Sequence, residues 1–309
     1  MKKIIEYFPD KLRGILYEQI KDKDNELEEI RIRNEKPIIL KFNKEENIIK
    51  YNVNSEEILT ILQLICENSI YSYQKQISSG FITLQGGHRV GLVGSCVIEN
   101  NILKNINYIN SFNFRIARQV IGCSSKLLKY ILNLENNSIF NTLIVSPPGY
   151  GKTTILKDVA RQISSGNEEL NFKGITVGIV DERSEIASLY KGVPQNDVGI
   201  KTDIIENVSK SIGMRILVRS MAPKVIIADE IGIPEDVDAI NYSLCSGCKG
   251  IFTAHGSNFN DICLNPVLKN LLDLHCFECL IFLDEVKRGY AKDVFILNKD
   301  SLEYEKIDE

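Results

Sequence analysis

The sequence predicts an α/β protein with a smaller α+β domain over residues 1–120, a joint over 121–140 and a larger domain over 141–309 built on a mainly parallel β-sheet. In the first part, several apolar segments alternate with period two, which indicates strands that cover a core with one face. From residue 141 onward, short continuous apolar runs alternate with helical patterns, which is typical of parallel strands covered by helices on both faces. The polar stretch 135–138 separates the two patterns.

The first domain begins with two predicted strands and a helix. Residues 26–33 alternate polar and apolar side chains, and residues 37–42 form a second short apolar segment. Asn54 and Ser55 are residue types that cap helices well, and a helical pattern with a broad apolar face follows them. The residues of that face are Ile58, Leu59, Ile61, Leu62 and Ile65.

A β-hairpin and a further strand complete the first domain. Two short apolar segments, 81–84 and 90–93, flank Gly86-Gly87, and paired glycines between such segments are a strong turn signal. Residues 112–118 alternate again and predict the last strand. The joint that follows has a helical pattern in Leu127, Leu128, Ile131 and Leu132.

The second domain has six predicted strands. The first four are continuously apolar, as expected for strands buried on both faces, and the tail from residue 284 predicts a hairpin that closes the sheet. The strand ranges are 142–145, 174–181, 225–229, 250–254, 280–284 and 293–297.

The composition permits packed cores and argues against nucleic acid as a partner. The 309 residues are 44% hydrophobic, and the formal net charge is −4. An acidic chain with no tryptophan and no basic stripe has no long-range attraction to nucleic acid. The first residues lack the apolar core of a signal peptide, and no window approaches the roughly 20 apolar residues of a membrane-spanning helix. We therefore expect a cytoplasmic protein that meets membranes only peripherally.

Eight cysteines lie inside or beside apolar segments. Without an export signal they are expected to be reduced thiols. Two C-x-x-C pairs, Cys245/Cys248 and Cys276/Cys279, have a spacing found in zinc sites. The second pair leads directly into an apolar strand, so thiols packed in the core are the favoured interpretation and a zinc site is the alternative.

Residues 146–154, SPPGYGKTT, lie between a predicted strand and a predicted helix. The phosphate-binding loop of nucleotide hydrolases is usually G-x-x-x-x-G-K-[ST], so Ser146 stands where its first glycine belongs. Serine is tolerable there if the position needs neither a positive φ nor a close approach. Backbone N–H groups at a helix N-terminus bind phosphate, a lysine reaches the β/γ phosphates, and a threonine reaches Mg²⁺. The sequence thus predicts a site for ATP and Mg²⁺, with the metal on Thr153, and its loop residues are Pro148, Gly149, Tyr150, Gly151, Lys152, Thr153 and Thr154.

A carboxylate on a neighbouring strand is the second requirement for hydrolysis. Residues 224–232, KVIIADEIG, place Asp229 and Glu230 at the carboxyl end of a strand, where α/β sheets bind their ligands. We expect Asp229 to be the Mg²⁺ ligand and Glu230 to be a candidate for the base that activates water. Two solvated acids at a strand end are the alternative.

Two further strand ends carry polar side chains. His255 follows the strand over 250–254, and the strand over 174–181 ends in Asp181, Glu182, Arg183 and Glu185. Because the carboxyl ends of parallel strands meet at one edge, Glu182 competes with Glu230 as the base, and Arg183 is a second catalytic candidate beside it. His255 is placed to sense the γ-phosphate, and a structural histidine is the alternative.

Four arginines are candidates for stabilising negative charge on the transferred phosphoryl group. Arg215 and Arg219 lie four residues apart before the Asp229 strand and share a face if that segment is a helix. Arg115 and Arg118 lie in the first domain and point to opposite sides if residues 112–118 are a strand. We expect one of the four to act on the nucleotide, and a surface ion pair is the alternative for each.

Together these motifs resemble the stage III sporulation protein AA family, RecA-like ATPases of endospore-forming bacteria. The stretch GIVDERSEIASLYKGVPQNDVG is long and unusual, which makes it more specific than a phosphate-binding loop alone. More widely, the chain is similar to the secretion-type traffic ATPases of type II and type IV systems. The strand end at 181–183 is also similar to the segment of rotary ATPases that carries their catalytic glutamate. The stretches that carry the family resemblance are 81–94, 146–154, 178–199, 219–232 and 253–256.

The resemblance implies a RecA-like P-loop NTPase core with an Asp box at 181–185, a Walker B motif at Asp229 and Glu230 and a His box at His255, and it favours Glu182 as the base. It also implies a homohexameric ring, an amino-terminal domain that swings against the core, and arginines such as Arg115 and Arg118 that reach the nucleotide. The implied location is the mother-cell face of the channel complex that joins mother cell and forespore, among other stage III sporulation proteins.

Three functions fit these expectations. The first is a motor that hydrolyses ATP to energise assembly of, or transport through, a membrane complex. The second is a nucleic-acid-dependent motor, because RecA-like cores also move DNA and RNA, and the acidic composition argues against it. The third is a nucleotide-gated scaffold with little turnover, which would have the same phosphate-binding loop as a motor.

Overall fold

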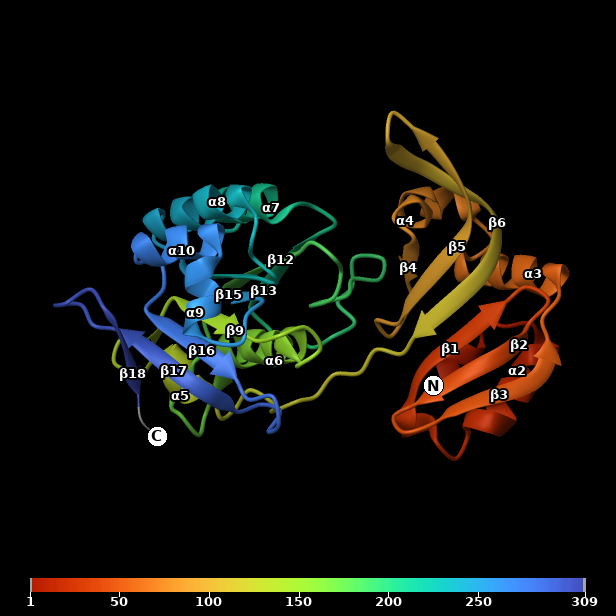
Figure 1. Cartoon of the computed structure of the whole chain (residues 1–309), viewed down its shortest axis with the longest axis horizontal. Coiled ribbons are helices and arrows are strands. Elements are labelled where there is room, and N and C mark those ends of the chain that lie inside the picture. Colours follow the sequence, from red (N-terminus) through yellow and green to blue (C-terminus); the bar gives the residue numbers. More distant parts are fainter. Residues whose placement is uncertain (1, 308–309) are drawn as a thin grey trace. The chain divides into compact units, whose positions relative to one another are not determined.

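The computed structural model describes residues 2–307, and it divides into two compact units (Figure 1). The first unit consists of the residues up to Arg118 together with Tyr190–Gln195, and the second of Gln119–Leu189 and the residues from Asn196 onward. The short segment Tyr190–Gln195 lies within the range that the sequence assigns to the second domain. Among the described residues, no helix combines the length and the apolarity needed to cross a membrane.

The first unit is built on a six-stranded antiparallel sheet with the strand order β3-β2-β1-β6-β5-β4. Its strands are β1 (Leu27–Arg33), β2 (Pro37–Phe42), β3 (Glu46–Asn52), β4 (Phe81–Thr83), β5 (Arg89–Glu99) and β6 (Ile102–Arg115). Its helices are α1 (Lys2–Ile5), α2 (Asp10–Ile20), α3 (Ser55–Ile65) and α4 (Gln74–Ser78), with the 3₁₀ turns η1 (Asp24–Glu26) and η2 (Ile70–Tyr73).

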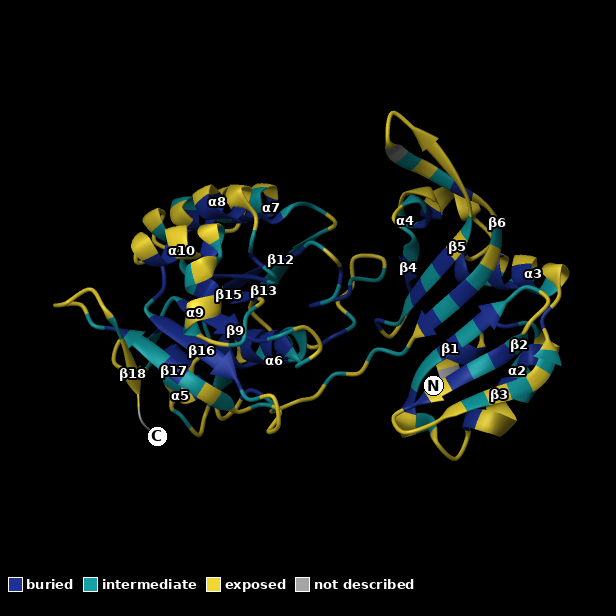
Figure 2. Cartoon of the chain, in the orientation of Figure 1, coloured by how far each residue is buried: buried dark blue, intermediate teal, exposed yellow. Residues whose placement is uncertain are grey.

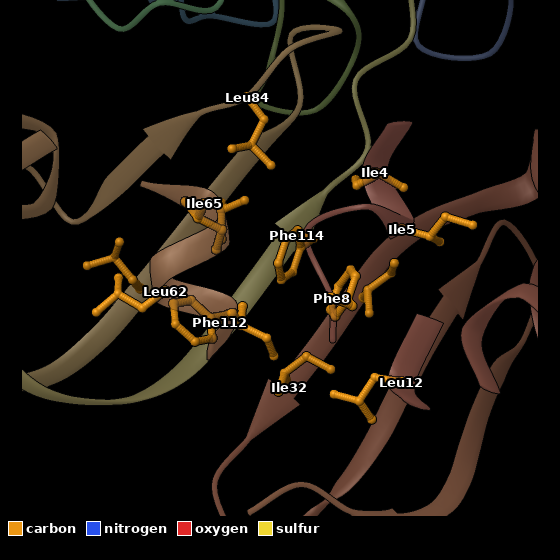
Figure 3. Close-up of a cluster of buried hydrophobic side chains, with 14 of the residues drawn as sticks. Ile4, Ile5, Phe8, Leu12, Ile32, Leu62, Ile65, Leu84, Phe112 and Phe114 are labelled. Carbon is orange, nitrogen blue, oxygen red and sulfur yellow. The ribbon is translucent and has the colours of Figure 1, made fainter. Parts of the chain in front are cut away.

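One hydrophobic core joins the sheet and the helices of this unit. Three aromatic rings lie at its centre: the ring of Phe114 is 4.6 Å from that of Phe8 and 6.3 Å from that of Phe112 (Figure 3). The predicted cap of α3 is confirmed, because the Asn54 side chain accepts the N–H of Glu57, whose carboxylate in turn accepts the N–H of Asn54. The helix start is therefore fixed by local hydrogen bonds.

The predicted hairpin around Gly86-Gly87 is confirmed, since β4 pairs with β5 across it and both glycines have positive φ. The last strand differs from its prediction. β6 begins at Ile102 and ends at Arg115, so Arg118 lies beyond the strand. The outer part of the β5–β6 ribbon is mostly exposed (Figure 2). Among the described residues of 95–107 only Ile106 is buried, so this ribbon gives little apolar alternation, which explains why the sequence pattern did not reveal it.

The second unit is built on an eight-stranded sheet with the order β13-β12-β14-β15-β9-β16-β17-β18. The first six strands in this order are parallel, and β17 and β18 are antiparallel, which confirms the mainly parallel sheet and its closing hairpin. The strands are β9 (Thr142–Val145), β12 (Val177–Asp181), β13 (Thr202–Glu206), β14 (Val225–Ala228), β15 (Lys249–Ala254), β16 (Cys279–Leu283), β17 (Ala291–Leu297) and β18 (Tyr304–Ile307). Two short ribbons pair β7 (Leu132–Asn133) with β8 (Ser138–Ile139) and β10 (Gly166–Asn167) with β11 (Phe172–Lys173).

Helices cover both faces of this sheet. On β14, Val225 and Ile227 pack into one core cluster with α6, while Ile226 and Ala228 pack into a second cluster with α7, α8 and α10. The central strands are accordingly buried along their whole length (Figure 2). The helices are α5 (Leu128–Ile131), α6 (Lys152–Ser165), α7 (Lys210–Ser220), α8 (Pro234–Cys245), α9 (Phe259–Leu264) and α10 (Pro266–Asp273).

Two features of the second unit differ from the sequence predictions, and a third, the packing of the cysteines as thiols, agrees with them for three residues of four. β13 was not predicted, because it is an edge strand whose residues are all half-buried and give no clear pattern. The helix expected in the joint is a single turn, α5. Of the C-x-x-C cysteines, Cys248, Cys276 and Cys279 are buried as packed thiols, whereas Cys245 is exposed.

Candidate nucleotide site

Four neighbouring parallel strands, β12, β14, β15 and β9, end at the same edge of the second sheet. Because their carboxyl ends adjoin, the residues that follow each strand are brought together. Glu182 follows β12, Asp229 follows β14, His255 follows β15 and Ser146 follows β9. The contacts below show which of these side chains meet.

The loop between β9 and α6, which the sequence predicts to bind phosphate, depends on glycine at two positions. Gly149 and Gly151 have φ values of +84° and +87°, which only glycine adopts easily, and a Cβ at either position would meet no atom within 4 Å. Glycine is therefore required at these two positions by the backbone conformation and not by a lack of space. Ser146 is buried and has no positive φ, so this position needs no glycine. α6 begins at Lys152, which leaves backbone N–H groups free at its N-terminus.

Lys152 is buried at the base of this loop. Its Nζ donates to the carbonyl oxygens of Ser146, at 2.7 Å, and Pro147, at 3.0 Å, and lies 3.1 Å from Nδ1 of His255. Burial lowers the pKa of the Lys152 ammonium, and the negative charges of Asp229 and Glu230 oppose that shift. The loop therefore holds a desolvated cation.

Thr153 and Asp229 form the second contact of the site. Oγ1 of Thr153 donates to Oδ2 of Asp229 at 2.5 Å, and the hydroxyl of Thr253 on β15 donates to Oδ1. Both oxygens of this carboxylate are thus held by hydroxyl groups from different elements. A hydroxyl and a carboxylate are oxygen ligands of the kind that Mg²⁺ prefers, so these residues fit the predicted metal.

Glu230 joins the loop to the neighbouring strands. Its φ of +52° is unusual for a non-glycine residue, and its N–H donates to Oγ1 of Thr253 at 2.8 Å. One carboxylate oxygen accepts from Arg183 at 2.5 Å, and the other lies 3.2 Å from Nε2 of His255. When Nε2 carries the hydrogen, His255 donates to Glu230 and accepts from Lys152, so it links the loop lysine to this carboxylate.

Glu182 has a different partner. Its Oε2 lies 2.6 Å from Nζ of Lys210, the first residue of α7. Both residues line a hollow of about 20 Å³, which has room for roughly one water molecule. Its other lining residues are Val180, Asp181, Arg183, Glu185, Ile186, Asp229 and Glu230.

Asp181 shapes the loop after β12 from within. It is 2% exposed, and its carboxylate accepts the N–H groups of Glu185 and Ala187, at 2.8 Å each, together with those of Ile186 and Ser188. Its oxygens are therefore occupied by backbone donors. Of the segment that the family resemblance assigns to the Asp box, Asp181 orders the loop while Glu182 and Arg183 reach the hollow.

Of the four candidate arginines, two lie on α7. Arg215 and Arg219 do share a face of α7, and their guanidinium carbons lie 5.1 and 6.0 Å from the ring of Tyr242 on α8. This face is opposite to the buried one, and Arg219 is nine residues from Lys210, or about 14 Å along the helix. Within one chain, Arg219 therefore does not join the cluster around Asp229.

Arg115 and Arg118 belong to the first unit. Arg118 donates to the backbone carbonyls of Leu27, at 2.7 Å, and Asp24, at 3.0 Å, so its guanidinium is engaged there. Arg115 is exposed at the end of β6, in register with Glu29 on β1 and Arg89 on β5.

Sequence reasoning missed three residues at this edge. Thr253 orients Asp229, Lys210 pairs with Glu182, and Lys157 lies near Asp181 and Glu185. Burial lowers the pKa of the Lys157 ammonium, which the nearby carboxylates oppose. A lysine in a helical pattern normally indicates a solvated face, so the sequence held no signal for Lys157 or Lys210.

Comparison with solved structures gives the fold a known counterpart. The chain aligns with the ATPase DotB of Legionella pneumophila at a TM-score of 0.59 and 13% identity, covering 93% of this chain and 81% of that one. It aligns with the pilus retraction motor PilT, solved with bound ADP, at a TM-score of 0.56 and 14% identity, covering 87% and 78%. The predicted RecA-like core with its preceding α+β unit is thereby confirmed as a fold.

Comparison of sequences is more specific. The chain is 39% identical to "Stage III sporulation protein AA" of Bacillus subtilis (strain 168) over 305 residues, which is 97% of this chain and 98% of the relative. It is 30% identical to "Protein SEEDLING PLASTID DEVELOPMENT 1" of Arabidopsis thaliana over 160 residues, or 51% of this chain and 22% of that protein. The family described as "Sporulation stage III, protein AA" matches residues 1–298. With a match over nearly the whole chain and a full-length relative at this identity, the protein belongs to the sporulation stage III protein AA family.

Proposed function

We propose that this chain is a Mg²⁺-dependent ATPase motor. The observation that carries the proposal is the meeting of Lys152, Thr153, Asp229 and the two glutamates at one edge of a parallel sheet. A loop lysine, a threonine–aspartate pair and an acid beside a hollow of one-water size are the parts that phosphoryl transfer to water requires. The solved structures with this fold include a named ATPase and a motor with bound ADP, which supports the same reading.

The residues take separate roles in this mechanism. Gly149 and Gly151 shape the loop whose backbone N–H groups hold phosphate oxygens, and Lys152 supplies positive charge there. Thr153 and Asp229 would hold Mg²⁺. When bound, the metal neutralises charge on the phosphate oxygens.

Glu182 is the better candidate for the base. Both oxygens of Glu230 are engaged, by Arg183 and by His255, whereas the ion pair with Lys210 occupies only Oε2 of Glu182. We assign Glu182 to accept the proton of the water that attacks the γ-phosphorus, while the bond to the ADP oxygen breaks. Glu230, Arg183 and His255 then form a network that connects the phosphate site to the β12 loop.

The cellular role is proposed from the family. We propose that hydrolysis energises assembly of, or transport through, the channel complex between mother cell and forespore, with other stage III sporulation proteins as partners at the mother-cell face. The name of the Bacillus subtilis relative refers to sporulation, and solved structures with this fold include an ATPase and a pilus retraction motor. We further propose a homohexamer in which Arg115 reaches a nucleotide, because Arg118 is already bonded to two carbonyls of its own unit.

The decisive experiment separates ATP binding from turnover in two variants. Glu182→Gln is expected to keep the ATP affinity and to lower kcat by about 10²-fold or more, since it removes only the proton acceptor. Glu230→Gln is expected to lower kcat less. Phosphate release and binding of a fluorescent ATP analogue are measured in parallel, with Glu235→Gln, an exposed glutamate of the same unit, as the matched control.

Normal turnover of Glu182→Gln would contradict its assignment as the base. A wild-type chain that binds ATP tightly and releases no phosphate would replace the motor with a nucleotide-gated scaffold. Stimulation of phosphate release by single-stranded nucleic acid, lost at high salt, would point to a nucleic-acid motor instead.

A further inference from the structure

Lys210 occupies a position that is unfavourable for a lysine side chain. It lies at the first position of α7, where the helix dipole disfavours a cation, and its side chain is 9% exposed. It also lies on the buried face of the helix, with Gly213, Met214 and Leu217. A lysine in such a stripe needs a partner that offsets the loss of solvent.

The partner is Glu182. Nζ of Lys210 lies 2.6 Å from Oε2 of Glu182, whose side chain is 37% exposed and lines the hollow. In the described part of the chain, residues 2–307, no hydrogen bond to Oε1 of Glu182 accompanies this one. The ion pair therefore fixes one oxygen and leaves the other available to a water molecule in the hollow that Glu182 lines.

The approach of α7 to β12 makes this pair possible. A Cβ at Gly213 would lie 2.5 Å from Cγ1 of Val180, so only glycine lets the helix come this close to the strand. Gly213 is one helical turn beyond Lys210, and Val180 is two residues before Glu182. The close contact thus places the first turn of α7 over the end of β12.

The two acids of the site differ in how they are held. The two partners of Glu230, Arg183 and His255, are 63% and 47% exposed, so both contacts are screened by solvent. Lys210 is buried, so solvent and salt weaken its contact with Glu182 less. Only Glu182 is held by a partner with little freedom of its own.

We propose that Lys210 is a positioning residue for Glu182: it holds the carboxylate at the edge of the hollow with one oxygen directed to water. This inference rests on the proposed function, in which Glu182 is the base. A misplaced base loses rate while the substrate is still bound, because the geometry of proton transfer is distorted and the phosphate loop is not.

The test compares Lys210→Met with Lys210→Arg. Lys210→Met is expected to lower kcat about 10- to 100-fold, the range typical of residues that orient a reacting group, and to change the ATP affinity less than about twofold. Lys210→Arg keeps the charge and is expected to restore most of kcat. Phosphate release, binding of a fluorescent ATP analogue and the thermal midpoint are measured for each, with Lys210→Gln as a second removal variant should Lys210→Met fold poorly.

The matched control is Lys249→Met. Lys249 also forms a 2.6 Å ion pair with a glutamate, Glu278, in the same unit, but it begins β15 at the opposite edge of the sheet. Its loss is expected to leave kcat unchanged. A purely structural effect of Lys210 would instead lower the thermal midpoint and the ATP affinity together.

A double-mutant cycle separates this inference from the proposed function. In a Glu182→Gln background, Lys210→Met is expected to cause no further loss of kcat, because the group it positions is gone. If Glu182→Gln abolishes turnover but Lys210→Met has no effect, has an additive effect or is not rescued by arginine, the positioning role is wrong and the motor stands. If Glu182→Gln turns over normally, the base assignment fails, and the role of Lys210 fails with it.

Discussion

His88 is a half-buried side chain whose charge state is tied to the backbone at the end of the first unit. Its Nδ1 accepts the N–H of Ala117 at 3.1 Å, two residues beyond β6. Burial lowers the pKa of the imidazole from 6.5 to about 4, and the charge of Arg118 acts in the same direction. The ring is therefore neutral at neutral pH, as an acceptor at Nδ1 must be.

This residue predicts a pH dependence of stability. The unfolded chain takes up a proton at His88 near pH 6.5 and the folded chain only near pH 4, so the free energy of unfolding falls as the pH is lowered between these values. The difference amounts to at most about 3 kcal/mol. His88→Asn, whose side-chain oxygen can accept from Ala117, is expected to lose this part of the dependence.

Urea unfolding at several pH values between 4 and 6.5 provides the measurement. The wild-type chain is expected to lose more stability over this range than the variant does. Parallel curves for the two proteins would show that His88 carries no part of the pH dependence.

At the scale of elements, α6 is fastened to the segment before it through Asp158. This carboxylate is fully buried and accepts the N–H groups of Ser124, at 2.9 Å, and Gly122, at 3.0 Å, as well as Arg161 at 2.7 Å. Burial by itself raises the pKa of Asp158, but these hydrogen bonds bring it below the ordinary value of 3.8. The stabilisation is therefore complete above pH 3.8 and is lost as the pH falls through the lower folded-state pKa.

Asp158→Ala is expected to lower the free energy of unfolding by about 3–5 kcal/mol, since it leaves the half-buried Arg161 and two N–H groups without their acceptor. Chemical denaturation checks this, with the exposed Glu235→Ala expected to change stability by less than about 0.5 kcal/mol. A loss for Asp158→Ala as small as that of the control would mean that the segment is held by other contacts.

The sequence predicted those elements whose apolar pattern or cap is set by residues close together in the chain. β9 and β14 are buried on both faces, so each is a continuous apolar run, and Asn54 caps α3 through its immediate neighbours. No residue of β13 is buried, and among the described residues of the outer ribbon of β5 and β6 only Ile106 is, so periodicity could not reveal either of them.

The candidate site also divides into residues that the sequence predicted and residues that it did not. The sequence could predict one part of the site, because the strand ends of a parallel sheet adjoin. This part consists of the loop at 146–154, Asp229 and the ends of β12 and β15. The pairing of Lys210 with Glu182 joins residues 28 positions apart through the packing of α7 on β12, and no sequence spacing encodes it. Their roles in catalysis stay predictions until the variants are measured.

At the scale of the whole molecule, the proposed ring makes its own prediction. If Arg115 of one chain completes the site of a neighbour, turnover per chain should rise with protein concentration and level off when rings are complete. An arginine supplied in this way contributes about 10³- to 10⁵-fold to the rate in related phosphoryl transfers, so Arg115→Ala should be nearly inactive.

Mixing two inactive variants tests the geometry directly. Arg115→Ala retains Glu182, and Glu182→Gln retains Arg115, so mixed rings should regain activity at some of their sites. Turnover is measured in the mixture and in each variant alone, with oligomer mass followed in the same samples. No recovery, or a turnover per chain that is independent of concentration in a monomer, would contradict the shared site.

The first unit includes six residues, Tyr190–Gln195, that are remote in the chain from the rest of the unit. Within that unit, Tyr190 and Lys191 both contact the carboxylate of Glu67, and Gln195 accepts the N–H of Gly86 at 2.7 Å. These contacts are exposed, so their contribution to the stability of the unit is expected to be small. The buried core of this unit is drawn from residues 4–114, so a fragment of residues 2–118 keeps that core and loses only the contacts of the hexapeptide.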